Sequence, residues 1–294
     1  MAVVAVIGGS GRMGRWFADF LSRDGYKIII SDKNERVGRD LAKKKRFTFV
    51  KNATEAARLS EIVILATPTL ATKTLLRKLT SHTSGTTLLV EISSIKQPVK
   101  KTIRSLTRGG AKIISIHPMF GPGANNLTDK SVIVAQEPRN CTAAKRLLSV
   151  LAKNGVRIIR SSLDDHDRLV ATTLALPHLM NFAFIEAIRK TGIPLKKIRE
   201  MGGTTFKLQL LIAEALYHES LSNEVSILAD NTHNTRAFAG FARQMNEVGR
   251  IAERNAKSEL LRRLRNDSAY LRNDRLFRMA HERFVLAVEG STPR

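Results

Sequence analysis

The chain has 294 residues, which is enough for two domains of ordinary size, and 43% of them are hydrophobic, so a substantial core is expected. Cys141 is the single cysteine, which excludes a disulfide or a cysteine metal cluster within these residues. The apolar runs of about five to eight residues are too short to span a membrane, and the start of the chain lacks the basic region of a signal peptide. The composition favours a cytoplasmic globular protein with no membrane segment.

The chain is strongly basic, with 49 Lys and Arg against 26 Asp and Glu and a net charge of +23. Such a charge suggests nucleic-acid binding, but the excess is spread along the sequence, with one tight run at residues 43–46. Only 5% of the residues are aromatic, and they do not interleave with basic clusters as a base-stacking platform requires. The pattern argues against nucleic-acid recognition and favours a solvated surface or the steering of small anions into a cleft.

Residues 1–160 alternate short β-rich runs with amphipathic stretches, which predicts βαβ units in a mostly parallel sheet. The expected strands are 3–7, 27–31, 62–66, 87–91, 112–116, 132–135 and 156–159, with a weaker one near 47–50. Helical periodicity predicts helices at 12–22, 69–79 and 141–151.

The first strand leads into a glycine-rich turn, in which Gly9, Gly11 and Gly14 form G-x-G-x-x-G before a helix. The first glycine would permit the tight turn, the second would let the backbone approach a pyrophosphate, and the third would allow close helix–strand packing. The phosphate would then lie at a helix N-terminus, which favours an anion. The turn therefore predicts a dinucleotide site, with contacts from Gly9, Ser10, Gly11, Arg12, Met13 and Gly14.

The second strand ends at Asp32, about 20 residues beyond the glycine turn, where a carboxylate accepts hydrogen bonds from ribose hydroxyls. An acid at this position favours NAD, because it would repel a 2′-phosphate, while Lys33 and Arg36 leave NADP open. Thr67 and Pro68 follow the strand 62–66 and are expected to reach the same cofactor, since ligands bind beyond the carboxyl ends of parallel strands.

Two further strand ends point to the same cleft. Ser94 and Lys96 follow the strand 87–91, and the segment SIHPMFGPG begins as the strand 112–116 ends. His117 is therefore expected at the end of that strand, on a loop that Pro118 and Pro122 stiffen.

After residue 161 the strand signals disappear, which predicts a domain boundary near 162 and an all-helical domain over 163–294. A long helix is expected at 164–190, nearly apolar all round and kinked at Pro177. Its apolar surface suggests an interface shared between two subunits. Further helical patterns cover 206–218, 224–255 and 260–288. His166 and Asp167 are expected to begin the long helix rather than to do chemistry.

The segments GGSGRMGRWF, EISSIK and IHPMFGP, in this order and spacing, resemble the prephenate/arogenate dehydrogenases of tyrosine biosynthesis. The stretch at 166–184 is similar to the first helix of that family's dimerisation domain. The resemblance covers roughly residues 1–230, and HPMFGP is its most specific part, because many oxidoreductases share the glycine turn. It implies an α/β fold with a Rossmann-type dinucleotide-binding domain over 1–162, followed by an all-helical dimerisation domain, in a homodimer.

The resemblance also implies a reaction, the NAD(P)-dependent oxidative decarboxylation of prephenate to 4-hydroxyphenylpyruvate. Hydride leaves C4 while the hydroxyl proton is drawn away, and loss of CO₂ makes the ring aromatic. His117 would be the general base, because imidazole titrates near neutrality. Ser94 would orient the hydroxyl or the imidazole, and Lys96 would bind a substrate carboxylate or support the loop. His178 would bind the carboxylate or keto group of the side chain, and no metal is implied.

One segment departs from the family pattern. The family usually carries an arginine in the helix after a glycine-containing turn, where its guanidinium holds the ring carboxylate. The corresponding residues 201–220 contain no arginine, and Lys207 is their only cation. Either Lys207 binds the carboxylate as a point charge, or Arg199 or Arg236 reaches it, including from the partner subunit. Arogenate is the nearest alternative substrate.

Two other classes of function stay open. A β-hydroxyacid dehydrogenase or an imine reductase would share the Rossmann-plus-helical plan but lack HPMFGP. A dinucleotide-binding regulator or a basic nucleic-acid-associated protein would account for the charge and the missing arginine, and its DNA affinity would fall steeply with salt.

Overall fold

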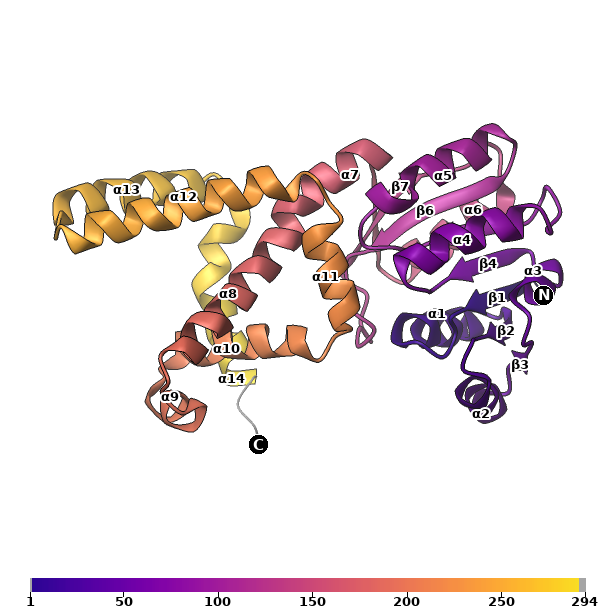
Figure 1. Ribbon diagram of the computed structural model, residues 1–294, viewed down its shortest axis with the longest axis horizontal. Helices are drawn as coiled ribbons and strands as arrows, with labels where there is room; N and C mark the ends of the chain where they lie inside the picture. The colour runs from indigo at the N-terminus through magenta and orange to yellow at the C-terminus, as the bar shows by residue number, and fades with distance from the viewer. Residues whose placement is uncertain (1, 291–294) are drawn as a thin grey trace. The chain divides into compact units, whose positions relative to one another are not determined.

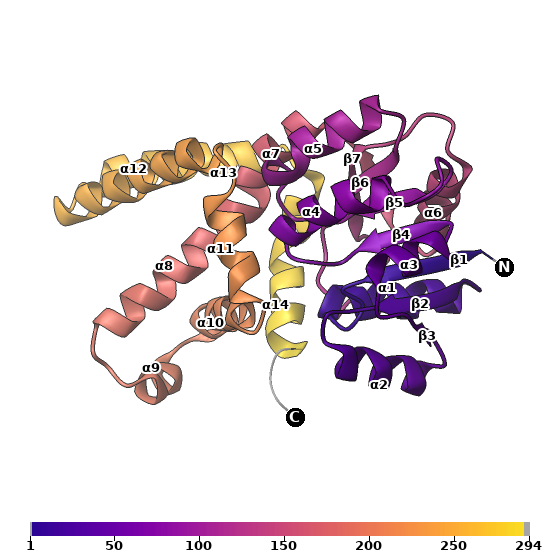
Figure 2. The ribbon, with the colours of Figure 1, turned by 45° about the vertical axis from the view of Figure 1, so that its right-hand side comes forward.

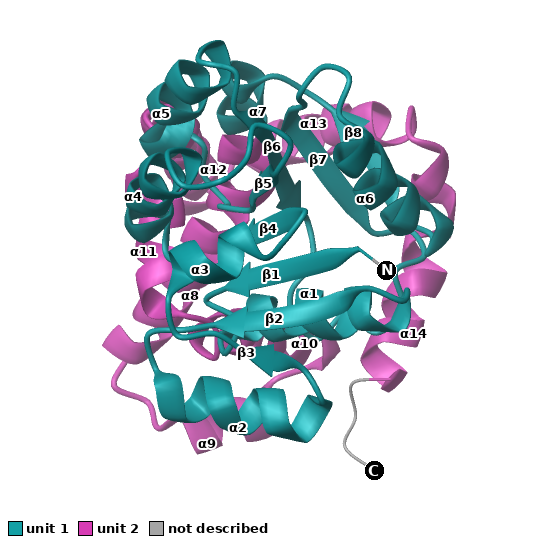
Figure 3. Ribbon diagram, turned by 90° about the vertical axis from the view of Figure 1, so that its right-hand side faces the viewer, with its two compact units in different colours: residues 1–169 teal, residues 170–294 magenta. Residues whose placement is uncertain are grey.

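A computed structural model describes residues 2–290 of the chain. They divide into two compact units between Leu169 and Val170 (Figure 3). The division falls inside helix α7 (Leu163–Val170), a few residues beyond the expected boundary.

The first unit is built on an eight-stranded sheet with the strand order β3-β2-β1-β4-β5-β6-β7-β8 (Figure 3). Neighbouring strands are parallel except β6 and β7, so the expected mostly parallel sheet is confirmed. Every strand lies within two residues of its predicted range. The strands are β1 (Val3–Ile7), β2 (Lys27–Ser31), β3 (Thr48–Phe49), β4 (Ile62–Leu65), β5 (Leu88–Glu91), β6 (Lys112–Pro118), β7 (Ser131–Gln136) and β8 (Arg157–Arg160).

Helices cover both faces of this sheet, because its strands are apolar on both sides (Figure 3). Val4 and Val6 pack with Phe17 of α1 on one face, whereas Ala5 and Ile7 belong to the core on the other face. Helices α1 and α6 cover the first face, and α3, α4 and α5 cover the second. The helices are α1 (Arg12–Arg23), α2 (Glu35–Lys45), α3 (Ala53–Arg58), α4 (Thr69–Thr80), α5 (Gln97–Arg108) and α6 (Thr142–Lys153).

Strand β6 is longer than predicted. It continues through His117 and Pro118, because β7 returns beside it in the antiparallel direction and pairs His117 with Ile133. The expectation that His117 begins a loop is therefore wrong, since a strand ladder on one side fixes its backbone. The register shifts between Ser115 and Ile116, just before the histidine.

The described part of the second unit is helical throughout, as predicted (Figure 1). The expected helix at 224–255 is broken at residues 230–233, because the side chain of Asn234 donates to the carbonyls of Ile227 and Leu228 and so caps the end of α11. The helices are η1 (Ala171–Ala175), α8 (Leu176–Lys190), α9 (Leu195–Met201), α10 (Thr204–Tyr217), α11 (Leu221–Ala229), α12 (Asn234–Glu253), α13 (Lys257–Leu271), η2 (Arg275–Met279) and α14 (Ala280–Gly290).

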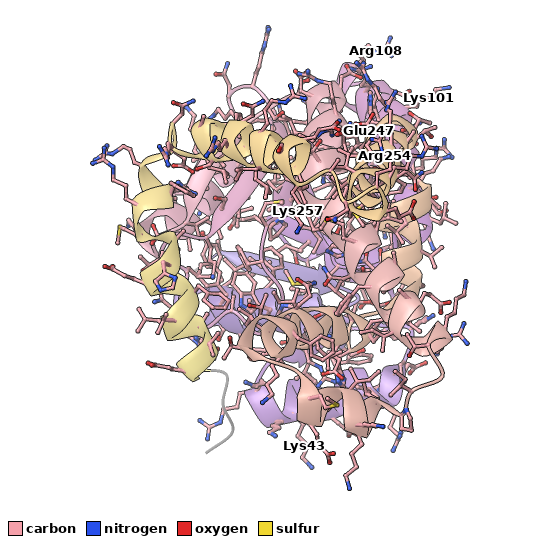
Figure 4. The ribbon with its side chains drawn as sticks, turned by 90° about the vertical axis from the view of Figure 1, so that its left-hand side faces the viewer. Lys43, Lys101, Arg108, Glu247, Arg254 and Lys257 are labelled. Atoms are coloured by element: carbon pink, nitrogen blue, oxygen red, sulfur yellow. The ribbon has the colours of Figure 1, made fainter. Side chains whose placement is uncertain are left out.

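Helices α12 and α13 lie side by side as a hairpin (Figures 1 and 2). Glu247 of α12 accepts from Arg263 of α13 at 3.0 Å, and Arg254 lies 3.8 Å from Glu259. Figure 4 labels Glu247 and Arg254. Two arginines of the basic C-terminal region are therefore paired with acidic side chains inside the hairpin.

The positive charge of the first unit is distributed over separate elements. Lys43 on α2 and both Lys101 and Arg108 on α5 are exposed (Figure 4). Other cations pair on the surface, as Lys45 does with Asp19 at 2.9 Å. Exposed pairs of this kind contribute little to stability, so these residues mainly keep the surface solvated.

The long apolar helix contains a π-helical turn. It runs from α7 through η1 into α8, and Pro177 lies in the first turn of α8. The π turn accommodates the missing N–H of the proline, so the helix continues beyond it. By length and composition alone the segment Leu163–Lys190 could cross a membrane, with a mean hydropathy of 1.3 and 22% of the 18-residue window buried. A helix that a second subunit covers needs the same composition.

Candidate active site

A cavity of about 760 Å³ lies at the carboxyl ends of β1, β2 and β4. Strand β1 lies between β2 and β4, so the chain winds away from it in both directions. Open α/β sheets bind ligands at this point of the topology. The residues that line the cavity include Gly8, Ser10, Gly11, Asp32, Lys33, Thr67 and Pro68.

The glycine turn allows the backbone to pack closely at this edge. Gly8 has a φ of +78°, and a Cβ there would lie 2.3 Å from the carbonyl oxygen of Ala66. A Cβ on Gly14 would lie 2.3 Å from the carbonyl oxygen of Gly8, so the start of α1 approaches the turn without space for a side chain. The assignment of the tight turn to Gly9 is wrong. Gly8 makes it, and Gly9 is required because its Cβ would lie 2.9 Å from the backbone carbonyl oxygen of Val6.

Asp32 ties the glycine turn to the end of β2. Its Oδ2 accepts from the backbone of Ser10 and its Oδ1 from the backbone of Asn34, each at 2.9 Å. A carboxylate has about four acceptor positions, so two are left for hydroxyls of a ligand. Helix α1 begins after Gly11 with no side-chain cap and no acidic residue in its first turn, which suits a phosphate.

Of the other predicted cofactor contacts, two line the cavity and two do not. Thr67 and Pro68 line the cavity, and the hydroxyl of Thr67 lies 2.8 Å from that of Thr72. Met13 packs against the core, and Arg12 lines a separate cavity of about 550 Å³ beside α1.

A chain of buried polar side chains begins at His117. Its Nδ1 lies 3.0 Å from Nε2 of His166, and Nδ1 of His166 lies 2.8 Å from Oδ1 of Asp167. Asp167 also accepts from the backbone of Lys96 at 2.9 Å and of Gln97 at 2.7 Å, at the start of α5. The side chain that the resemblance marks as a base is thus connected to a carboxylate through a second histidine.

The side chain of Lys96 is also fully buried. Its Nζ donates to Oε2 of Glu91 at 2.8 Å, to the carbonyl of Ser93 at 2.8 Å and to the carbonyl of Ile116 at 2.7 Å. These three acceptors match the three donors of an ammonium group, so the structure favours support of the site over a contact with substrate. Burial lowers the pKa of Lys96, and the carboxylate of Glu91 opposes that shift.

Burial also affects the two histidines. It lowers the pKa of His117 well below the ordinary value of 6.5, and the neighbouring His166 and Lys96 lower it further. Burial lowers the pKa of His166 as well, although the hydrogen bond to Asp167 opposes this. Both rings are therefore neutral at neutral pH, so each keeps one ring nitrogen without a proton.

These shifts make stability depend on pH. In the unfolded chain both histidines take up a proton near pH 6.5, whereas in the folded protein they do so only at lower pH. We therefore expect the free energy of unfolding to fall by up to about 1.4 kcal/mol per histidine for each pH unit below about 6.5. Urea unfolding at fixed protein concentration, at about pH 7.5, 6.5 and 5.5, measures this dependence. A stability that stays constant over this range would contradict the assigned burial.

Ser94 lies in the bend after β5, partly buried, and its hydroxyl makes no hydrogen bond to the residues that the structure describes. It is thus available to a ligand.

The second unit contains the remaining predicted residues. Nδ1 of His178 lies 2.5 Å from Oε2 of Glu224, which is 3% exposed. Lys207 is exposed on α10, whereas Arg199 forms an ion pair with Glu214. Arg236 is exposed on α12.

Sequence reasoning missed the partners of the predicted residues. The sequence identified His117 and Lys96 but treated His166 and Asp167 as the start of a helix, and it did not consider Glu91. The available signal was a histidine and an acid at the start of a helix that already had Asp164 and Asp165 in its first turn.

Two family models match the chain. The model described as prephenate dehydrogenase, nucleotide-binding domain, covers residues 17–160, and the model described as prephenate dehydrogenase, dimerization domain, covers residues 162–266.

Individual proteins are similar over most of the chain. The probable arogenate/prephenate dehydrogenase of Methanocaldococcus jannaschii is 26% identical over 85% of this chain and 56% of its own length. The T-protein of Enterobacter agglomerans is 23% identical over 88% of this chain and 64% of its own length. The chain thus spans less than two thirds of these curated relatives. A crystal structure of prephenate dehydrogenase from A. aeolicus, in complex with hydroxyphenyl propionate and NAD⁺, has a TM-score of 0.74 at 22% identity and covers 92% of this chain and 97% of that one. At this identity the likeness shows the fold.

Proposed function

Because the chain belongs to the prephenate dehydrogenase family, we propose that it converts prephenate to 4-hydroxyphenylpyruvate by NAD-dependent oxidative decarboxylation, a reaction of tyrosine biosynthesis. The observation that carries the proposal is the buried, neutral His117 at the carboxyl end of β6. Strands β1, β4, β5 and β6 are parallel neighbours, so the carboxyl end of β6 lies at the same edge of the sheet as the cavity.

The residues at the cavity fit a dinucleotide. The glycine turn leaves no space for side chains, Asp32 keeps free acceptor positions, and the first turn of α1 is uncapped. Ser10, Gly11 and Asp32 would hold the phosphates and a ribose. When bound, the nicotinamide ring supplies the hydride acceptor.

The chain's own residues would then manage the proton and the charges of the substrate. His117 accepts the proton of the 4-hydroxyl as the C4–H bond breaks, and Ser94 positions that hydroxyl. Loss of CO₂ leaves the electron pair of the broken C–C bond in the ring, which becomes aromatic as the C4 oxygen takes a proton back and forms the phenol. His178 and Lys207 are proposed to bind the anionic groups of the substrate. Arogenate is the alternative, as the name of the relative from M. jannaschii reflects.

The choice of cofactor is proposed to depend on Asp32. In Asp32→Asn the negative charge is lost, and an amide nitrogen replaces one of the two oxygens that accept from the backbone of Ser10 and Asn34. We expect the affinity for NADH to fall about 10–100-fold relative to that for NADPH, which is the range for a hydrogen bond to a charged group. Fluorescence titration with both cofactors measures the ratio. Asp40→Asn on α2 is the control, because Asp40 does not line the cavity, and an unchanged ratio in Asp32→Asn would contradict the role.

The chain is further proposed to act as a cytoplasmic homodimer. The second unit matches a dimerization domain, and its long apolar helix is mostly uncovered within one chain. A second copy would bury that surface.

The function is tested by reduction of NAD⁺ and NADP⁺, followed by absorbance, with prephenate and with arogenate. We expect turnover with prephenate and NAD⁺. Absence of turnover in all four combinations would contradict the proposed function.

A further inference from the structure

We propose that His166 and Asp167 are positioning residues, which hold His117 as the tautomer that carries its proton on Nδ1 and leaves Nε2 to accept the proton of the substrate. The inference deepens the proposed function, and its catalytic meaning rests on that function. The tautomer itself is a property of the free protein and can be measured without substrate.

The direction of each hydrogen bond can be worked out from the carboxylate of Asp167, which is the final acceptor. Its Oδ2 accepts from the backbone of Gln97 and its Oδ1 from the backbone of Lys96, at the positive end of α5. An ionised carboxylate only accepts hydrogen bonds. Nδ1 of His166, 2.8 Å from Oδ1, must therefore be the donor.

The protonation of His166 then determines which nitrogen of His117 is the donor. His166 is neutral, because burial lowers its pKa, so with a proton on Nδ1 its Nε2 is an acceptor. Nδ1 of His117, 3.0 Å away, must then donate to it. His117 is also neutral, and a neutral ring carries one N–H, so its Nε2 is unprotonated. This atom makes no hydrogen bond to any residue in the described range 2–290.

The same hydrogen bonds also stabilise the imidazolium of His117 that forms when this ring takes up a proton. When Nε2 of His117 takes a proton, the ring becomes a cation that donates to His166, which in turn donates to the carboxylate of Asp167. A carboxylate that orients a histidine and stabilises its imidazolium has this role in serine hydrolases. Lys96 faces the same region and opposes the charge, but its ammonium is paired with Glu91.

The start of helix α7 does not by itself require His166 and Asp167 to be buried. Asp164 and Asp165 already place acidic side chains in the first turn of α7, and they bond to surface residues. His166 is fully buried and Asp167 is 3% exposed in the same turn. Two polar residues at this depth need partners, and their partners are His117 and the start of α5.

The tautomer is tested by nitrogen NMR on the full chain labelled with ¹⁵N-histidine. The chain has seven histidines, and loss of one spin system in His117→Asn assigns the signals of His117. Long-range ¹H–¹⁵N correlations show which ring nitrogen carries the proton. We expect Nδ1–H with a bare Nε2 at neutral pH, and an Nε2–H tautomer would overturn the inference.

The catalytic consequence is tested by two variants of matched size. In His166→Gln the amide oxygen can still accept from Nδ1 of His117, whereas in His166→Met only a thioether sulfur remains, which is a weak acceptor. We expect kcat to fall about 10²–10⁴-fold in His166→Met, the range for a base in the wrong tautomer, and to stay within about 10-fold of wild type in His166→Gln. The KM for substrate and the affinity for NADH should change little in either variant.

The outcomes separate the two proposals. Equal losses of kcat in the glutamine and methionine variants would overturn the positioning role, even where the wild type turns prephenate over. If the wild type turns over no substrate, the proposed function fails, while the NMR spectrum still decides the tautomer of His117.

Discussion

Replacement of His117 by asparagine is expected to lower kcat by about 10²–10⁴-fold, which is the usual contribution of a general base. The amide nitrogen of asparagine occupies the position of Nδ1 and can still donate to His166, so the local hydrogen bond at 3.0 Å in the wild type has a substitute. No atom replaces Nε2, and the substrate hydroxyl then has no base. Steady-state kinetics with prephenate and NAD⁺ measures kcat and KM separately.

The control for this variant is His82→Asn. His82 is exposed after α4, and its ring bonds to the carbonyl of Lys78 at the surface. It should leave turnover near the wild-type value. Near-normal kcat in His117→Asn, with NADH binding intact, would show that another group removes the proton.

Replacement of Lys96 by methionine is expected to lower the free energy of unfolding by about 3–5 kcal/mol, because removal of one partner leaves a buried charge uncompensated. The side chains of Lys96 and Glu91 are both fully buried. Glu91 would keep its bonds from the backbone of Ser93 and from the hydroxyl of Ser115 but lose its only buried cation among the described residues. Urea unfolding followed by circular dichroism measures the change.

Two further variants show whether burial is the cause. Lys100→Met, in the first turns of α5, removes a surface partner of Asp164, and it should change stability little. Lys96→Met combined with Glu91→Gln removes both charges and should recover part of the loss. A Lys96→Met variant as stable as Lys100→Met would contradict the buried pair.

The strands of the first unit were predictable because each depends mainly on local pattern. A run of apolar β-branched residues between turn signals forms a buried parallel strand wherever it packs. The glycine spacing and the acid after β2 likewise report local geometry, and the sequence placed both at the cavity. The exception is the end of β6, which only the antiparallel return of β7 could determine.

The site shows the same division. The sequence was sufficient to predict His117, Ser94 and Asp32 as candidates, because each follows a predicted strand. It could not predict that His117 forms a hydrogen bond with His166, which lies 49 residues further along the sequence. Nor could it predict that Asp167 accepts a hydrogen bond from the backbone of Lys96 at the start of α5, 71 residues earlier. Those contacts arise when the sheet and helices pack, and they depend on side chains that look like ordinary helix-start residues.

Local spacing therefore defined the fold class, the family and the cofactor edge of this protein, since those follow from patterns within about 20–30 residues. Tertiary packing alone decided that Lys96 is a buried support and that Gly8 makes the turn. It also decided which nitrogen of His117 is left to act. The physical reason is that the burial of a side chain and the direction of its hydrogen bonds depend on the groups that surround it. The chain brings those groups together only when it folds.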